Sequence, residues 1–433
     1  MMPALLLAAA LAGFAPPLSE STELPPPPSG AAPESVATDD PLAPVLPTPV
    51  EPDEIPDLRH WKAWPVWPTM LAELDGQLVP NQTEGRDGFA LGRFRLGLRG
   101  QPLPWLGFTG TVELSIDKPG LLDAVVVLTP VPGVRFDIGY TKPPLFGSFI
   151  NEPVHAMPFP DRAPVVISFR TRRDLGIGLT LARREIPFEL RIRVGNGGGL
   201  LENDDRHLAA YGNLDLVLGR ARTGGKGKFL GLRLGGTGLV ERVESRTSIR
   251  ARHPLGYVYA PGVPIAGSRI VGTGHAIGYI GPARLTFEAA IAREARIGDL
   301  DSDPTTPREA KTALWSGGLT AELAVVLLGE PREVGLPPAA KRGAWRGGVI
   351  EVAGRFDAMA IGRHAEDVVP NGSLGGGAAI RWWPVDLASL SLTGFGLRYD
   401  HPPSEEPDRQ WSWGLLLRLG VYWGLQVGSD GRR

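Results

Sequence analysis

The sequence contains no cysteine, which excludes disulfide bonds, a cysteine-ligated metal site and a lipid anchor attached through cysteine. After the N-terminal segment there is no run of about 18 apolar residues, so a membrane-spanning helix is excluded. The formal net charge is only −2, which gives no general attraction to nucleic acid. A β-barrel remains compatible with these absences, because its apolar residues alternate with polar ones.

Catalytic and cofactor motifs are missing as well. The sequence has no Gly-x-Ser-x-Gly motif, and the glycine-rich residues 224–228 lack the spacing and the Ser or Thr of a phosphate-binding loop. The seven histidines are scattered, and no two stand at the spacing of metal ligands. We therefore expect no enzyme activity, no cofactor and no bound metal.

What the sequence does contain is a two-residue alternation near residue 100. In residues 93–99 apolar side chains alternate with arginines, and in residues 106–117 they alternate with threonine, serine and acidic residues. A period of two is typical of strands with one apolar and one polar face. A packed core would exclude the full charges of the polar face. In a transmembrane barrel, lipid contacts the outside and water fills the lumen, so these charges point inward.

The alternation recurs along the chain and defines its organisation. We expect an all-β fold, a transmembrane antiparallel β-barrel of about 16 strands over residues 69–423, since such barrels have an even strand number. A short tail, residues 424–433, follows. Residues 1–15 are predicted to be a signal peptide, with a retained helix as the alternative. The Pro-rich, acidic residues 16–68 indicate a disordered periplasmic segment, or alternatively a ligand for a partner domain.

Six segments interrupt the alternation where long loops are expected, and three of them are residues 299–311, 363–371 and 401–409. Residues 142–168 are rich in proline and aromatic residues, and we expect them to fold into the lumen. Residues 244–268 and residues 329–344 are expected to form loops at the rims of the barrel. Residues 142–168 matter most, because a loop that narrows the lumen favours a porin and a loop that fills it favours a non-conducting barrel.

The alternation also assigns charged residues to the lumen. Those expected to line the pore and contact anions are Arg93, Arg95, Arg99, Arg135, Lys142, Arg191, Arg193, Arg355 and Arg418. The acidic pore-lining residues are expected to be Glu113, Asp117, Asp137, Glu189, Glu351 and Asp357. A guanidinium is always charged and offers planar donors, so a ladder of arginines can pass anions stepwise. The alternative is that each arginine pairs with a lumen carboxylate and braces the wall.

Several motifs resemble the phosphate-selective porin O/P family, and they occur in the family's order. Residues 92–100 resemble its opening Arg-rich strand, and residues 136–144 resemble a strand that runs into a Lys-Pro-Pro turn. Further similar stretches are residues 173–177, 343–357, 381–384 and 413–419. The chain departs from the family in its scarcity of lysine, which the family's phosphate-binding members use in the pore.

The resemblance implies a trimeric porin in the outer membrane of a Gram-negative bacterium. It would contact outer-membrane lipid and allow passive diffusion of small hydrophilic solutes, with a preference for anions such as phosphate. No nucleic acid partner and no enzyme activity are implied. The alternative from another class is a non-conducting outer-membrane barrel with a structural or envelope-assembly role.

Overall fold

The structure is a computed structural model that describes residues 66–79, 87–115, 119–183, 186–198, 207–219, 230–255, 258–297, 310–332, 338, 347–385, 387–401 and 410–423. All of these residues belong to one compact unit, Val36–Arg433. The expected signal peptide, nearly all of the Pro-rich segment and the C-terminal tail lie outside the described residues.

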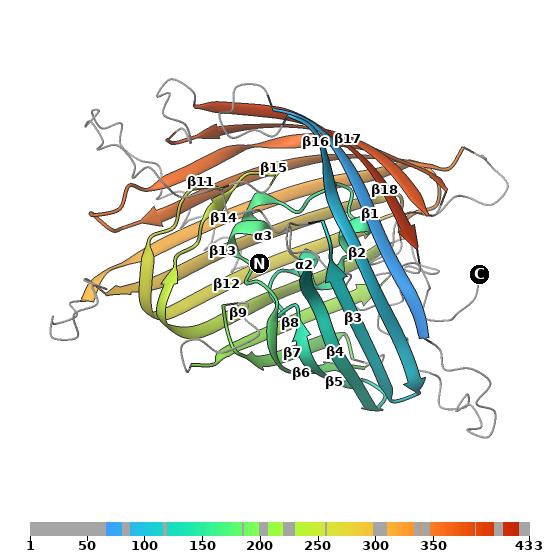
Figure 1. The fold of residues 1–433 in the computed structure, drawn as a ribbon, viewed down its shortest axis with the longest axis horizontal. Helices are drawn as coiled ribbons and strands as arrows, with labels where there is room; N and C mark the ends of the chain where they lie inside the picture. Colours follow the sequence, from blue (N-terminus) through green and yellow to red (C-terminus); the bar gives the residue numbers. More distant parts are fainter. Residues whose placement is uncertain are drawn as a thin grey trace. The chain divides into compact units, whose positions relative to one another are not determined.

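Sixteen strands of the described chain close into one antiparallel barrel, which confirms the predicted fold class (Figure 1). The first nine are β1 (Val66–Leu78), β2 (Gly88–Leu103), β3 (Leu106–Glu113), β4 (Gly120–Val131), β5 (Val134–Thr141), β6 (Asp174–Ala182), β7 (Phe188–Gly195), β8 (Ala209–Gly219) and β9 (Leu230–Thr247). The other seven are β12 (Pro264–Ile280), β13 (Ala283–Ile297), β14 (Ala310–Leu328), β15 (Val349–Arg363), β16 (Asn371–Val385), β17 (Ala388–Tyr399) and β18 (Trp411–Trp423).

The strand that the sequence signalled most weakly closes the barrel. β1 pairs with β2 on one side and with β18 on the other, where Leu71 lies opposite Tyr422. β1 begins at Val66, ahead of the expected start at residue 69. Its alternation is masked because its inward positions carry both acidic residues and Leu71, which is fully buried.

The last strand illustrates how the sequence produces two different faces. Along β18, exposed and buried residues alternate without a break. The exposed ones are Trp411, Trp413, Leu415, Leu417, Leu419, Val421 and Trp423. The buried ones are Ser412, Gly414, Leu416, Arg418, Gly420 and Tyr422. The outer face is thus apolar and the inner face mixed and charged, which is the reverse of a soluble protein.

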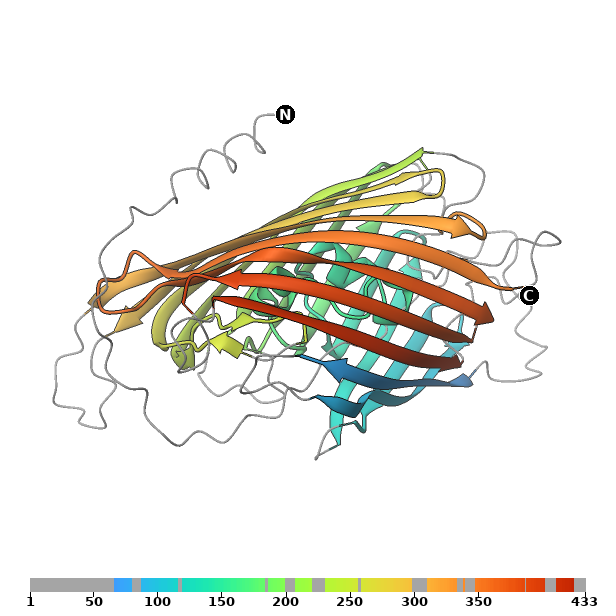
Figure 2. The ribbon, with the colours of Figure 1, turned by 90° about the horizontal axis from the view of Figure 1, so that it is seen from above.

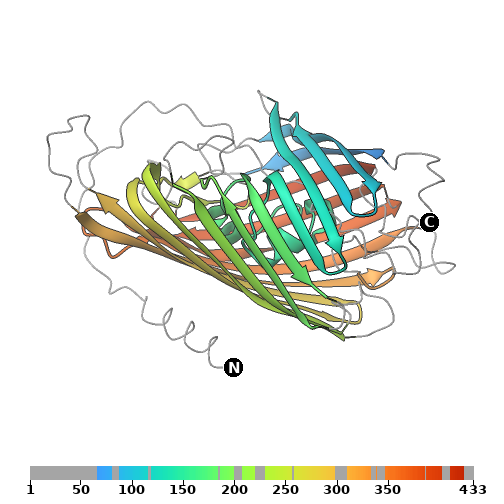
Figure 3. The same ribbon diagram turned by 90° about the horizontal axis from the view of Figure 1, so that it is seen from below.

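The connection between β5 and β6 folds into the barrel, as expected. This inner loop, residues 142–173, contains α2 (Gly147–Asn151), the 3-10 turn η2 (Val154–Ala156) and α3 (Pro164–Phe169). Both α-helices lie within the ring of strands when seen from three sides (Figure 1, Figure 2 and Figure 3). Their apolar side chains are buried against inner-wall residues of β8, β9, β12, β13, β15 and β17. The inner loop therefore has a dry core inside the barrel.

A second insert comes from the connection between β9 and β12. This second insert, residues 248–263, carries a small two-stranded sheet of β10 (Ala251–Arg252) and β11 (Val258–Ala260). It joins the same apolar cluster as the inner loop, and the backbone N–H of Arg252 donates to Ser168 Oγ at 3.0 Å. The predicted loop, residues 244–268, is longer than the observed insert, because strand pairing continues to Thr247 and resumes at Pro264.

The two ends of the barrel differ in the length of their connections. At one end, two-residue turns join β2 to β3, β4 to β5 and β12 to β13. The turn before β5 contains Gly133, whose φ of 81° is a conformation that favours glycine. The inner loop and the second insert both start from the opposite end. No helix of the described residues is long and apolar enough to span a membrane.

Candidate functional site

The predicted lumen cations divide into two groups according to their burial. Five are buried on the inner face, namely Arg93, Arg95, Arg193, Arg355 and Arg418. Four are only half-buried, namely Arg99, Arg135, Lys142 and Arg191. The alternation in the sequence assigned all of them to one side of the wall, but it carries no information about what covers that side.

The buried group is paired with carboxylates. Arg95 Nε donates to Glu113 at 2.6 Å, and Arg193 Nη1 lies 2.5 Å from Asp137. Arg193 also donates to the carbonyl oxygen of Asp174 at 2.8 Å. A guanidinium held in this way is fixed in position and has few donors left for a passing anion. For these arginines the geometry matches the bracing alternative.

Arg93, Arg355 and Arg418 bind the inner loop in addition to the wall. Arg93 Nη1 lies 2.5 Å from Glu73, and Arg418 donates to both oxygens of Asp75 at 2.6 and 2.8 Å. Arg355 Nε lies 3.0 Å from Asp357, and its guanidinium carbon lies 4.4 Å from the ring centre of Phe159 in the inner loop. These arginines therefore connect the wall to the inner loop.

The half-buried group contains two arginines that are neighbours on the wall. Arg135 on β5 and Arg191 on β7 flank Thr180 of β6, which is register-paired with both. Arg191 forms an ion pair with Glu189 and donates to Asn151 Oδ1 at 3.0 Å. Nε of Arg135 is buried without a hydrogen-bond partner among the described residues. The charged groups that act on Arg135 are Asp137, Glu189, Arg191 and Arg193.

Lys142 follows Thr141, at the opposite end of β5 from Arg135, and begins the inner loop. Its Nζ donates to the carbonyl oxygen of Phe149 at 3.0 Å and lies 4.7 Å from the ring centre of the same residue. The guanidinium carbons of Arg162 and Arg170 lie 5.2 and 5.0 Å from that ring centre. Three cations therefore gather around one aromatic ring on the inner loop.

The predicted acidic residues are placed as follows. Glu113, Asp137 and Asp357 pair with arginines named above. Glu189 pairs with Arg191 and, at 3.2 Å, with Arg233. Glu351 receives two hydrogen bonds of 2.6 Å from Arg332. Asp117 lies outside the described residues.

Sequence reasoning missed several members of these networks. Glu73 and Asp75 lie on the weak strand β1, and Asp161 and Glu152 lie in the inner loop, where no periodicity signals their direction. Arg284 could have been found, because it shares the parity of Thr286 and Glu288 on β13. Arg332 follows β14, inside the expected loop 329–344, so nothing in its sequence context indicated a buried side chain.

Two titratable groups of the inserts have shifted pKa values. Burial raises the pKa of Asp161, but Arg418 and Arg93 lower it more, so it lies below the usual 3.8. Burial lowers the pKa of His253 well below its usual 6.5, so this side chain is neutral at pH 7. His253 packs edge-on against Phe395 with ring centres 4.6 Å apart. Within the described ranges, no group of three or more His, Asp or Glu side chains could hold a metal ion.

Comparison with known proteins gives structural neighbours only. No family model and no curated protein matches the sequence. Among solved structures, the chain is similar to an anion-selective porin from Comamonas acidovorans, with TM-score 0.53, 13% identity, and coverage of 83% of this chain and 100% of that one. It is also similar to the outer membrane channel DcaP of Acinetobacter baumannii, with TM-score 0.50, 10% identity, and coverage of 83% and 97%.

A third neighbour is OmpT, an outer membrane protein of Vibrio cholerae, in its trimer form. The TM-score is 0.51, the identity 10%, and the coverage 83% of this chain and 100% of that one. At such identities the likeness shows the barrel fold that these proteins share and not their solutes. The resemblance to the phosphate-selective O/P family therefore stays a resemblance of motifs.

Proposed function

We propose that this protein is a porin of the outer membrane of a Gram-negative bacterium, through which small hydrophilic solutes diffuse. The observation that carries the proposal is the reversed barrel wall, with an apolar outer face and charged residues inside. Membrane barrels have short periplasmic turns, so the inner loop enters from the extracellular end. The porin and channel neighbours of the same fold support this assignment.

We further propose that the channel prefers anions. The route lies along β5 and β7, where Arg135 and Arg191 are half-buried, and not along β2, β15 and β18, whose arginines hold the tip of the inner loop. We assign the selectivity to Arg135, because it is half-buried and its charged neighbours include Arg191 and Arg193 as well as Asp137 and Glu189. Phosphate is one solute of this class, and the arginines alone favour no particular anion.

The chain is also proposed to form a homotrimer, the form in which one neighbour was solved. An apolar groove of about 550 Å³ on the outer face near β1–β4 supports such a contact. It is lined by exposed side chains that include Leu96, Leu98 and Val112. Crosslinking of the full chain in detergent tests this point, and a single monomeric band would reject it.

The test of the proposed function is a planar-bilayer recording of the refolded full chain under a KCl gradient. Stepwise conductance increases with a reversal potential on the anion side are expected. Conductance without ion preference would keep the porin and reject the anion route.

A second candidate function is favoured by one observation. The inner loop and the second insert share a continuous buried apolar cluster inside the barrel, as a plug would. A folded barrel that gives no conductance steps would support the non-conducting structural or assembly role. Folding is checked independently through the change in gel mobility on heating.

A further inference from the structure

The tip of the inner loop, residues 152–162, is held by an unusual set of side chains. Six arginines of the described wall and its connections donate hydrogen bonds to this loop tip. They are Arg93, Arg284, Arg332, Arg355, Arg381 and Arg418. All of them except Arg284 donate to backbone carbonyl oxygens of the tip, so these contacts depend on the exact path of the loop.

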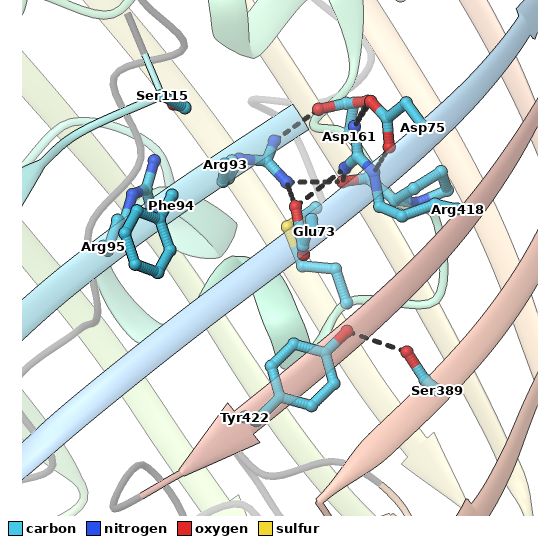
Figure 4. Close-up of polar contacts among 12 residues, drawn as sticks. Glu73, Asp75, Arg93, Phe94, Arg95, Ser115, Asp161, Ser389, Arg418 and Tyr422 are labelled. Atoms are coloured by element: carbon cyan, nitrogen blue, oxygen red, sulfur yellow. Dashed lines mark hydrogen bonds and ion pairs between the residues drawn. The ribbon is translucent and has the colours of Figure 1, made fainter. Parts of the chain in front are cut away.

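Asp161 is the residue of the loop tip at which three of these six arginines meet. Its carboxylate pairs with Arg93 and, at 3.1 Å, with Arg418, and its carbonyl oxygen accepts from Arg355 at 3.0 Å. Figure 4 shows the carboxylate beside the two guanidiniums, where Glu73 pairs with both of them, at 2.5 and 3.3 Å, and Asp75 pairs with Arg418. The three arginines belong to β2, β15 and β18, so one residue joins the loop to distant parts of the wall.

The wall does not need Asp161 for its own charge balance. Arg93 keeps Glu73 at 2.5 Å, and Arg418 keeps both oxygens of Asp75. If Asp161 becomes neutral, each arginine still has a carboxylate partner, and no buried cation is left alone. What is lost is the charge-assisted attraction between the wall and the loop tip, which is the stronger class of hydrogen bond.

The side chain next to this contact covers a region of small residues. Phe159 packs on Ala324 of β14, Ala353 of β15 and Ala379 of β16, and all four are buried. The three alanine side chains are too small to fill the space that Phe159 occupies beside the wall. If the tip moves away, the inner wall at β14–β16 is left open to water.

We propose that Asp161 is a positioning residue that holds the loop tip over these three alanines and thereby sets the open cross-section of the lumen. Neutralising Asp161 frees the tip and opens a second aqueous route along β14–β16. The prediction that the conducting lumen widens rests on the proposed porin function, but the prediction that the loop tip moves does not.

The first experiment measures tip movement without any conductance. Because the chain has no cysteine, the single substitution Ala353→Cys gives one thiol behind the tip. Its rate of labelling by a negatively charged methanethiosulfonate is compared in the otherwise unchanged chain and with Asp161→Asn. We expect labelling at least about tenfold faster with Asp161→Asn, equivalent to about 1.4 kcal/mol.

Three further variants define the outcome. Asp161→Glu keeps the charge and is expected to restore slow labelling, and Asp367→Asn, at an exposed ion pair of the rim, is expected to leave the rate unchanged. Glu152→Gln, which weakens the contact with Arg284, tests the same tip if Asp161→Asn does not fold. Equal labelling rates for a folded Asp161→Asn or Glu152→Gln variant and the unchanged chain would overturn the proposal.

The second experiment is the single-channel conductance of Asp161→Asn. A larger conductance than that of the unchanged chain is expected, together with the faster labelling. If the unchanged chain does not conduct but labelling is accelerated, the porin function fails and the positioning role stands. If Asp161→Asn and the unchanged chain conduct equally and are labelled at equal rates, the positioning role fails and the porin function stands.

Discussion

Arginines on two sides of the lumen occupy equivalent inward positions of their strands but lie in different surroundings. On the β18 side, Arg418 is buried, binds Asp75 twice and contacts Asp161 of the inner loop. On the β5 side, Arg135 is half-buried, and its Nε has no acceptor among the described residues. The tip of the inner loop, which is bound to Arg418 and not to Arg135, produces this difference.

An arginine that faces the lumen does not for that reason contact solutes in the pore. A guanidinium with a carboxylate on one side and a loop carbonyl on the other serves structure, since its donors are already used. The same side chain without those partners keeps a charge that acts on solutes passing nearby. Mutation on the β18 side should therefore mainly lower stability, and mutation on the β5 side should mainly change ion preference.

The largest contrast is expected in stability. Arg418→Ala leaves Asp75 and Asp161 as buried carboxylates with fewer partners, which should cost about 3–5 kcal/mol of unfolding free energy. Arg135→Ala should cost less than about 1 kcal/mol, because the buried Nε of Arg135 has no partner to lose within the described ranges. Urea unfolding followed by tryptophan fluorescence in detergent measures both. Equal losses would remove the distinction between the two sides.

The next contrast is between the two faces of one strand. Leu417 is exposed on the outer face beside the buried Arg418. Leu417→Arg places a charge in lipid, and near the midplane this should cost about 2–4 kcal/mol. Gln410→Arg, just before β18 and nearer the interface, should cost about 0–1 kcal/mol. Equilibrium folding into vesicles tests the pair, and a neutral Leu417→Arg would contradict the assigned register.

A smaller effect is expected at the rim. Arg296 lowers the pKa of Asp367 to about 2 through a hydrogen-bonded ion pair. Because half of the Asp367 side chain is exposed, solvent screens the pair, and Asp367→Asn should change stability by less than about 1 kcal/mol. Urea unfolding at pH 7 gives the value. A loss as large as that of Arg418→Ala would mean that burial does not explain the contrast.

The smallest effect concerns pH. The pKa of Asp161 lies below 3.8 in the folded protein, so its contacts are fully present above that value and weaken only as pH falls through the lowered pKa. The charged groups around it are Glu73, Asp75, Arg93, Arg355 and Arg418. Labelling of the thiol in the Ala353→Cys variant, corrected for thiol ionisation, should be the same at pH 5 and pH 7. Faster labelling at pH 5 would contradict this assignment.

The barrel fold could be predicted from the sequence, but the side-chain contacts inside the lumen could not. Alternation along β2, β7 and β18 predicts strands and their inward faces, because lipid on one side and the lumen on the other impose a period of two. The even strand number follows from the general rule for bacterial outer-membrane barrels. Partners such as Glu73 with Arg93, or Asp161 with Arg418, join residues that are distant in sequence. Their pairing depends on barrel closure and on the path of the inner loop, which no local period encodes.

The division of the lumen into a braced side and an anion route is tested most directly by the reversal potential of Arg135→Gln under a KCl gradient. A unit charge about 8 Å from a passing ion contributes about 0.5 kcal/mol in water, roughly a twofold change in occupancy. We therefore expect Arg135→Gln to lower the anion-to-cation permeability ratio about twofold, and raised salt to weaken this shift. Arg363→Gln, which removes the same charge at the rim, should leave the ratio unchanged. An unchanged ratio in Arg135→Gln would contradict the assignment of the route to β5 and β7.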